Sequence, residues 1–171
     1  MTALVFVDTN VLVYARDASE PSKQPIALGW LDQLWREEVG RTSIQVLSEY
    51  YVTVTRKLSP GLHADDAWDD VQAMLSWRPT ATDEALLRRG REVQQRHRLS
   101  WWDSLIVGAA QLQDCSLLLS EDMQDGATYG TVSVRSPFAL QASEAARDYR
   151  IVPSTNRHRN RGRPKQTGAR R

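Results

Sequence analysis

Hydrophobic residues fall along the chain in two patterns that predict different elements. Short unbroken apolar runs are typical of buried strands and occur at residues 3–7 and 115–119, with further short strand candidates at 41–43, 78–80 and 131–134. Apolar residues at helical spacing predict helices within residues 11–17, 25–38, 44–58, 65–75, 83–97 and 100–113. Strands that alternate with helices predict an α/β sandwich around a parallel sheet.

The same periodicity predicts where the six tryptophans lie. Four of them fall on the apolar stripes of predicted helices, which favours packing in the core over base stacking: Trp30, Trp35, Trp68 and Trp102. Trp77 and Trp101 fit these stripes less well and are candidates for an interface.

The composition is that of a soluble globular protein. The length of 171 residues suits one domain and a tail, and 41% of residues are hydrophobic and 25% charged. The single cysteine, Cys115, is expected to be buried in a strand and allows no internal disulfide, which favours a reducing compartment. The apolar start is too short for a secretion signal, and no run is long enough to cross a bilayer. We therefore expect a cytoplasmic protein without membrane contact.

The net charge of +1 conceals an uneven distribution. Residues 150–171 hold eight of the 22 basic residues and no acidic residue, so residues 1–149 hold 14 basic and 21 acidic residues, a net charge of −7. An acidic body is natural for an enzyme that gathers carboxylates around a cation, and a basic arm favours contact with a polyanion or an acidic partner. We expect residues 1–142 to form the folded domain and residues 143–171 a basic, disordered tail.

Acidic residues directly follow two of the predicted strands. Asp8 follows residues 3–7, and Asp122 comes just after the Leu-Leu-Leu strand that ends at residue 119. The carboxyl ends of parallel strands open onto one edge of the sheet, where such sheets bind ligands. Asp103 lies in the first turn of a helix whose start should face the same edge, and Glu49 lies in the second turn of another. Four carboxylates from distant segments are therefore expected to converge.

Converging carboxylates repel one another unless a cation lies between them. Hard oxygen ligands suit Mg²⁺ or Mn²⁺, and such an ion can activate water and neutralise charge on a phosphodiester. The sequence offers no evident Ser-His or Cys-His pair for nucleophilic catalysis. Metal-assisted hydrolysis is therefore the chemistry that we expect.

Each acid also has a purely structural interpretation. Asp8 could cap the helix that follows it, and Asp103 could form a capping box with Ser100. Glu49 lies off the main apolar stripe of its helix and could be a solvated surface residue, and Asp122 could be an ordinary turn residue. Periodicity alone does not decide between these interpretations and convergence.

Four segments resemble the motifs of PIN-domain proteins and occur in that family's order. They are residues 5–15 (VFVDTNVLVYA), 43–51 (SIQVLSEYY), 99–110 (LSWWDSLIVGAA) and 118–126 (LLSEDMQDG). The resemblance extends from about residue 3 to residue 140. It implies a PIN-like three-layer α/β/α sandwich with a central mainly parallel sheet, and an endoribonuclease that uses Mg²⁺ or Mn²⁺. Members of the VapC type are toxins that a small antitoxin neutralises by occupying the cleft, and they usually form homodimers.

The resemblance also assigns roles to individual residues. Asp8 and Asp103 would bind the metal directly, Asp122 directly or through water, and Glu49 would hold a second metal or a metal-bound water. Thr9 and Asn10 would position Asp8 and the substrate phosphate, Ser120 would be an accessory residue, and Asp125 would be a possible extra ligand. Asp125 could equally be a loop residue before Gly126.

The basic tail departs from the pattern of the family, which usually stops soon after a segment like residues 136–140. Arg161-Gly-Arg163-Pro-Lys165 resembles an AT-hook core, which can place its arginines in a narrow A·T minor groove. The tail could equally bind polyanions generally, strengthen RNA affinity, or bind nothing. Two alternatives to a toxin therefore remain: a PIN nuclease of RNA processing, and a catalytically idle nucleic-acid-binding regulator that uses the tail.

Overall fold

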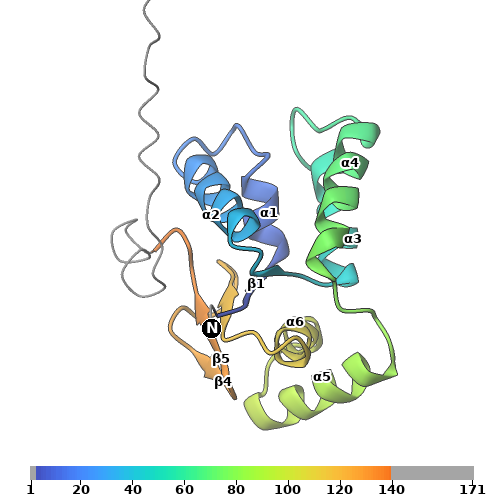
Figure 1. The fold of residues 1–171 in the computed structure, drawn as a ribbon, viewed down its shortest axis with the longest axis vertical. Helices are drawn as coiled ribbons and strands as arrows, with labels where there is room; N and C mark the ends of the chain where they lie inside the picture. Colours follow the sequence, from blue (N-terminus) through green and yellow to red (C-terminus); the bar gives the residue numbers. More distant parts are fainter. Residues whose placement is uncertain (1–2, 140–171) are drawn as a thin grey trace, which may run out of the picture.

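Short strands and longer helices alternate along residues 3–139, the residues that the computed structural model describes. In chain order the elements are β1 (Val5–Val7), α1 (Thr9–Tyr14), α2 (Gln24–Arg36), β2 (Gly40–Arg41), α3 (Ile44–Arg56), α4 (Ala64–Met74), the 3₁₀ helix η1 (Leu75–Trp77), α5 (Glu84–His97), α6 (Trp101–Leu112), β3 (Leu117–Leu119), β4 (Thr128–Tyr129) and β5 (Val132–Arg135). Figure 1 shows α1 and α2 on one side of the strands and α5 and α6 on the other.

The five strands form one sheet in the order β2-β1-β3-β5-β4. β1 pairs in parallel with both β2 and β3, β3 pairs in parallel with β5, and only the β4–β5 pair is antiparallel. From β1 the chain passes first to one neighbour, β2, and later to the other, β3, so right-handed crossovers place the intervening helices on opposite faces. The predicted three-layer α/β/α sandwich is confirmed.

The direction in which strands are added to the sheet reverses at β1, and this point predicts where a ligand would bind. Open α/β sheets bind their ligands beyond the carboxyl ends of the strands, where the strand order changes direction. Here that point lies between β1 and β3, which are paired from Val5 with Leu117 to Val7 with Leu119. All six of these strand residues are buried, so side chains that follow the two strands are the first to reach the edge.

One of the weaker strand predictions was wrong, and one strand was not predicted. Residues 78–80 form no strand, and Thr80 makes an isolated parallel bridge with Ser43. β4 was not predicted, because its two residues, Thr128 and Tyr129, leave no room for an alternating pattern. They form a hairpin with β5, and Gly130 supplies the positive φ of 65° that the turn requires.

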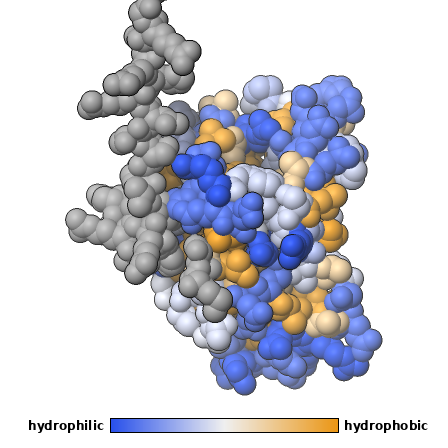
Figure 2. All heavy atoms as spheres, viewed as in Figure 1, coloured by the Kyte–Doolittle hydropathy of each residue, from blue (hydrophilic) through white to orange (hydrophobic). Residues whose placement is uncertain are grey.

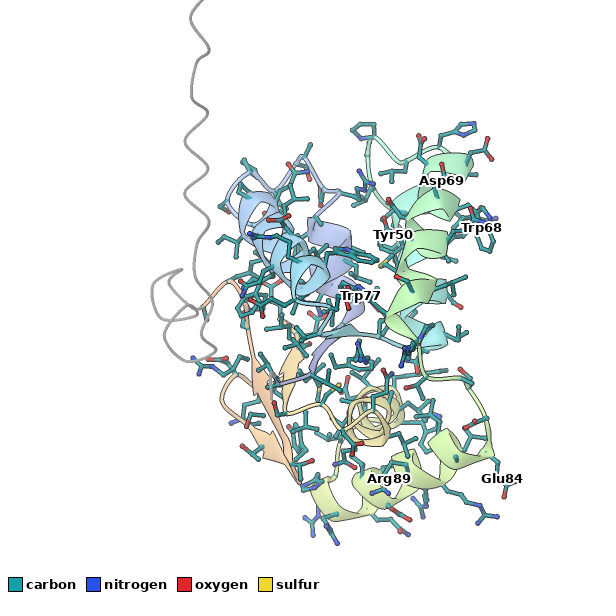
Figure 3. The ribbon with its side chains drawn as sticks, in the orientation of Figure 1. Tyr50, Trp68, Asp69, Trp77, Glu84 and Arg89 are labelled. Carbon is teal, nitrogen blue, oxygen red and sulfur yellow. The ribbon has the colours of Figure 1, made fainter. Side chains whose placement is uncertain are left out.

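The tryptophan predictions were correct for Trp30, which is buried, and wrong for three others. Trp35, Trp68 and Trp102 are 39%, 51% and 63% exposed. In α4, the residues that pack inward are Ala67, Val71 and Met74, so the buried stripe is rotated by one position away from Trp68. Figure 3 shows Trp68 projecting outward from α4.

Trp77 shows the opposite error. It was a candidate for an interface, yet it is 3% exposed and its ring lies 4.9 Å from that of Trp35. The ring also covers Gly40, where an added Cβ would come within 2.5 Å of it. A 3₁₀ turn directly after α4 turns this side chain inward, and helical periodicity does not register that turn.

The prediction that Cys115 is buried is confirmed, although β3 begins two residues later, at Leu117. Polar residues dominate the face shown in Figure 2, with hydrophobic residues in smaller patches between them. Within residues 3–139, no helix has the length and apolar character needed to cross a membrane. The predicted domain boundary at residue 142 and the tail lie outside the described residues.

Candidate functional site

The carboxyl ends of β1 and β3 lie side by side and present polar residues to the same edge. The backbone N–H of Asp8 donates to the carbonyl of Leu119 at 3.0 Å, which extends the β1–β3 ladder by one residue. Asp8 is therefore the first residue after β1. The first three residues after β3 are Ser120, Glu121 and Asp122. The sheet thus brings together two acids that are distant in the sequence.

Asp8 is buried and its carboxylate accepts three hydrogen bonds. Oδ1 accepts from the backbone N–H of Thr9 at 2.7 Å, which makes Asp8 the N-cap of α1, as its structural interpretation predicted. Oδ2 accepts from the Ser120 hydroxyl at 2.7 Å and from the Asn10 amide at 3.2 Å. A carboxylate offers about four lone-pair directions, so one remains open beside these three bonds.

Asn10 joins the two strand ends. Its Nδ2 lies 3.2 Å from an oxygen of Asp8 and 3.2 Å from an oxygen of Asp122, and 3.4 Å from the Ser120 hydroxyl. The amide nitrogen carries two protons, and its two closest acceptors are the two carboxylates, so it can donate one proton to each. Two such bonds laid end to end limit the gap between the two carboxylate oxygens to about 6.4 Å. Asp8 and Asp122 therefore share one donor.

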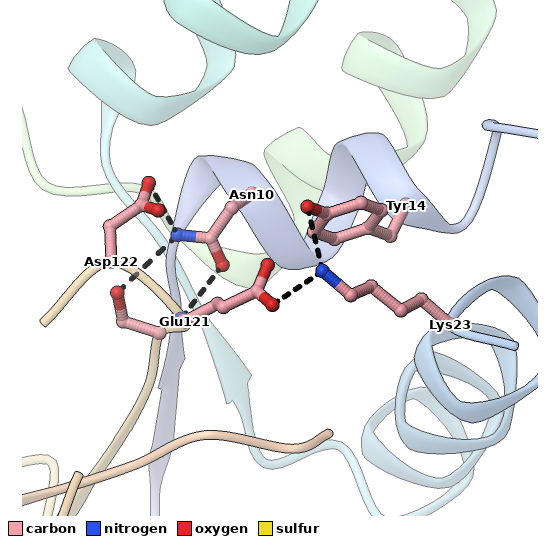
Figure 4. Close-up of polar contacts among 6 residues, drawn as sticks. Asn10, Tyr14, Lys23, Glu121 and Asp122 are labelled. Atoms are coloured by element: carbon pink, nitrogen blue, oxygen red, sulfur yellow. Dashed lines mark hydrogen bonds and ion pairs between the residues drawn. The ribbon is translucent and has the colours of Figure 1, made fainter. Parts of the chain in front are cut away.

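The same side chain also fixes the turn that carries Asp122. The Oδ1 atom of Asn10 accepts from the backbone N–H of Glu121 at 3.1 Å (Figure 4). Both the oxygen and the nitrogen of the Asn10 amide are therefore hydrogen-bonded. The N–H of Glu121 and the carboxylates of Asp8 and Asp122 together determine its orientation. An alanine at this position would remove the hydrogen bonds that hold the turn after β3 and Asp122, and one of the three that Asp8 accepts.

Glu49 reaches the site from α3. Its Oε2 accepts from the Thr9 hydroxyl at 3.1 Å and its Oε1 from Gln45 at 3.0 Å. The side chain is exposed, as its structural interpretation predicted, yet its contact with Thr9 places it one residue from Asp8. The two interpretations of Glu49 are thus compatible, because the rim of a site open to substrate is itself exposed to solvent.

The electrostatics of Asp8 reflect this arrangement. Its pKa is raised from 3.8 to about 6, first because burial removes water from the carboxylate, with smaller contributions from the charges of Asp122 and Glu49. The hydrogen bonds from Ser120 and Thr9 act in the opposite direction. A buried carboxylate with two acidic neighbours is therefore only partly compensated by its own hydrogen bonds.

The side chain of Lys23, which lies outside the acidic cluster, forms an ion pair with Glu121. Lys23, at the start of α2, lies 2.5 Å from Glu121 Oε1 and 3.1 Å from the Tyr14 hydroxyl, and its ammonium lies over the Tyr14 ring (Figure 4). This pair directs Glu121 away from Asp122, so the turn presents one carboxylate to the site instead of two. No sequence pattern indicated a role for Lys23, because it lies 98 positions from Glu121.

Asp103 is held within its own helix. The Ser100 hydroxyl accepts from the backbone N–H of Asp103 at 3.1 Å and donates to its Oδ2 at 2.7 Å. Ser100 caps α6 as predicted, although the Asp103 carboxylate bonds the hydroxyl of Ser100 where a standard capping box would use its backbone N–H. Among residues 3–139, the hydrogen bonds of this carboxylate join it to Ser100 alone, so no hydrogen bond links Asp103 to the residues that surround Asp8, Glu49 and Asp122.

Asp125 occupies a structural position near the end of β5. Its Oδ1 accepts from the backbone N–H of Ser136 at 2.8 Å and from Arg135 at 3.3 Å. These bonds fasten the loop after β3 to the end of β5, which fits the alternative interpretation of Asp125 as a loop residue. Arg161, Arg163 and Lys165 lie outside the described residues.

The donor chemistry of the site fits a hard divalent cation. The side chains that meet beyond β1 and β3 offer carboxylate, amide and hydroxyl oxygens and neither thiolate nor imidazole, which suits Mg²⁺ or Mn²⁺. The raised pKa of Asp8 indicates a buried negative charge that a cation would stabilise. In the part of the chain that the structure describes, no group of three or more Asp, Glu, His or Cys side chains is arranged to hold a metal ion.

A second polar cluster lies at the opposite end of α1. Arg16 forms an ion pair with Asp70 of α4, and the hydroxyl of buried Tyr50 donates to the same carboxylate at 2.5 Å. The cluster borders a pocket of about 520 Å³ between α1, α2 and α4. It fastens α1 to α3 and α4, and so supports the helix whose first turn holds Asp8, Thr9 and Asn10.

Comparisons with known proteins agree with this fold. No curated protein sequence matches the chain. A solved structure described as a toxin-antitoxin complex from Klebsiella pneumoniae has a similar fold, with a TM-score of 0.56 and 18% sequence identity, over 78% of this chain and 97% of the other. The model of the PIN domain family matches residues 5–124, which include β1, β3 and the four acids Asp8, Glu49, Asp103 and Asp122. The chain therefore belongs to the PIN domain family.

Proposed function

We propose that the protein is a Mg²⁺- or Mn²⁺-dependent endoribonuclease and the toxin of a VapBC-type toxin–antitoxin pair. The observation that carries the proposal is the shared hydrogen bonding of Asp8 and Asp122 to one amide, at the point where the sheet changes direction. PIN domains are generally nucleases, and the carboxylate, amide and hydroxyl oxygens at the ends of β1 and β3 are the ligand types that suit metal-assisted hydrolysis.

The proposed ligands are Asp8, Asp103 and Asp122, with Glu49 holding a second ion or a bound water. A divalent cation would supply an activated water and neutralise charge on the phosphodiester. The chain itself supplies orientation: Ser120 and Asn10 fix Asp8, Asn10 fixes Asp122, and Thr9 fixes Glu49. Two Asp oxygens held by one amide are also kept close enough to act on one phosphate.

The inclusion of Asp103 rests on the direction of α6. A short turn connects α6 to β3, and in it the N–H of Cys115 donates to the carbonyl of Ala110. The chain reverses direction at this turn. From Leu112 back to Asp103 a helix rises about 14 Å, whereas β3 rises about 7 Å from Leu117 to Leu119 before the turn that carries Asp122. The start of α6 is therefore long enough to reach the edge of the sheet at which β3 ends, which supports Asp103 as a ligand.

The role as a toxin is supported by the likeness of fold to the Klebsiella pneumoniae complex. We accordingly propose a small antitoxin partner that occupies the cleft, a homodimeric state and action in the cytoplasm. The basic tail, with Arg161, Arg163 and Lys165, is proposed to strengthen the binding of RNA or to contact DNA. Truncation after Arg150 should then weaken nucleic-acid binding and flatten its dependence on salt.

The test is cleavage of RNA by the purified full-length protein in Mn²⁺, with mapping of the cut sites. Asp8→Asn, Asp103→Asn, Asp122→Asn and Glu49→Gln keep the shape of each side chain and remove its charge, so each should reduce cleavage strongly. Asp69→Asn is the matched control, because Asp69 is an exposed acid on α4 (Figure 3). Equal cleavage by the wild type and Asp8→Asn, or none by either with varied RNAs, would contradict the proposal.

The toxin role needs a separate measurement. Induced expression in a bacterial host should stop growth, and co-expression of the product of a short neighbouring reading frame should restore it. Growth that is unaffected by a protein active on RNA in vitro would favour a PIN nuclease of RNA processing over a toxin.

A further inference from the structure

The first turn of α6 carries two adjacent tryptophans with opposite environments. Trp101 is half-buried and packs against the core. Trp102 is 63% exposed, the largest exposed fraction among the large hydrophobic side chains of residues 3–139. Single exposed apolar residues are common on protein surfaces, so exposure alone assigns no role. The position of this residue, directly before Asp103, is what makes it informative.

The backbone around Trp102 is held firmly. Ser100 bonds both the N–H and the carboxylate of Asp103, and the hydroxyl of Ser104 donates to the carbonyl of Ser100 at 2.7 Å. Successive helical side chains point about 100° apart, so Trp102 flanks Asp103 without covering it. An indole on a fixed turn beside a proposed metal ligand offers a flat face at low conformational cost.

The acidic charge of residues 1–149 disfavours RNA binding, so a contact that does not depend on charge would add to the affinity. RNA must approach an acidic body, since residues 1–149 hold 21 acidic and 14 basic residues. Two basic residues near the strand ends, Lys23 and Arg135, form ion pairs with Glu121 and Asp125. Stacking of a base on an aromatic ring adds affinity that does not depend on positive charge.

We propose that Trp102 is a stacking platform for an unpaired nucleobase of the RNA next to the scissile phosphate. The proposal rests on the proposed nuclease function and adds a determinant of substrate class to it. A base that stacks on Trp102 has to leave its own helix, so the site favours single strands and loops over duplexes. Since every base has a flat face, Trp102 selects for unpaired structure more than for sequence.

The test uses the full-length protein and a fluorescein-labelled single-stranded oligouridylate. Binding is measured by anisotropy in Ca²⁺, and cleavage kinetics in Mn²⁺. Trp102→Ala should raise both Kd and KM by about 5- to 100-fold and leave kcat within about threefold. Trp102→Phe should restore most of the affinity, whereas Trp102→Leu, which is apolar but has no ring, should not.

A matched control and a spectroscopic signal separate stacking from a structural effect. Trp68→Ala removes another half-exposed indole, which projects from α4, and should leave Kd unchanged. Titration with oligouridylate should quench tryptophan fluorescence in the wild type, and most of that quenching should be absent in Trp102→Phe.

Three results would overturn the inference: an unchanged Kd in Trp102→Ala, equal rescue by Trp102→Leu and Trp102→Phe, or a fall of the Trp102→Ala protein to a smaller oligomer in light scattering. The last would show that Trp102 contacts a second copy of the chain. If the wild type cleaves no RNA while Trp102→Ala still weakens oligouridylate binding, the proposed nuclease function fails and the base-binding role of Trp102 stands.

Discussion

The side-chain nitrogen of Asn10 lies 3.2 Å from an oxygen of Asp122, although the two residues are 112 positions apart in the chain. The same nitrogen contacts Asp8, so one neutral amide bridges the acids at the ends of two strands. The contact defines the site more closely than any acid does alone, because it fixes the separation of two carboxylates and the turn between Ser120 and Asp122.

Asn10→Ala should therefore impair the site without removing any charge. Loss of the amide removes one hydrogen bond from each of the two carboxylates and the acceptor of the Glu121 N–H. Residues that orient metal ligands typically contribute 10- to 100-fold in metal affinity or activity, and we expect a loss of about that size in both Mn²⁺ affinity and RNA cleavage. Calorimetric titration with Mn²⁺ and a cleavage assay measure the two. Gln95→Ala, at an exposed position of α5, should change neither, and a fully active Asn10→Ala protein would exclude the proposed role.

The stability of the metal-free protein should depend on pH through Asp8. Its folded-state pKa of about 6 lies above the ordinary value of 3.8, so the folded state binds this proton more tightly than the unfolded state. The resulting stabilisation is complete below about pH 4 and is lost as the pH rises through about 6, with a total of up to about 3 kcal/mol.

Urea unfolding in EDTA between pH 4 and pH 8 measures this dependence. In Asp8→Asn this contribution disappears, so the variant should lose less stability across that interval and should be the more stable protein above about pH 7. Mn²⁺ should raise the stability of the wild type above pH 6 and have little effect on the variant. Parallel pH curves for the two metal-free proteins would show that Asp8 does not carry the shift.

Replacing two glycines by alanine should change the free energy of unfolding in opposite directions. At Gly40 an added Cβ would lie 2.5 Å from the buried ring of Trp77, so Gly40→Ala should destabilise the fold by about 1–3 kcal/mol. At Gly29, an exposed position within α2, a Cβ meets nothing within 4 Å, and Gly29→Ala should stabilise the fold by about 0.5–1 kcal/mol. Urea unfolding of both variants gives the comparison, and similar values for the two would contradict the packing of Trp77 on Gly40.

Cys115 should be chemically inert in the folded protein. It is 1% exposed, and burial raises the pKa of its thiol from 9.0 to about 12, so almost no thiolate is present at pH 8. An aromatic disulfide reagent should detect no thiol in the native protein and one thiol in denaturant. Rapid reaction of the native protein at pH 8 would mean that the turn between α6 and β3 opens readily.

Local sequence patterns determined the layers of this protein and the location of its acids along the chain. Unbroken apolar runs marked β1 and β3, because a strand buried on both faces needs apolar residues throughout. Since Asp8 and Asp122 follow those runs, their meeting at one edge was predictable from parallel pairing alone. Ser100 was likewise identifiable as a cap, because capping depends on residues only a few positions apart.

Only the tertiary structure decided which faces and which partners were used. Helical periodicity placed Trp102 in the core and Trp77 at an interface, and both predictions were wrong, because burial depends on where a neighbouring helix lies and on a single 3₁₀ turn. Asn10 bridging Asp8 and Asp122, and Lys23 holding Glu121, join residues from distant segments. A pattern that describes near neighbours contains no information about such contacts, which arise when the chain crosses from β2 past β1 to β3.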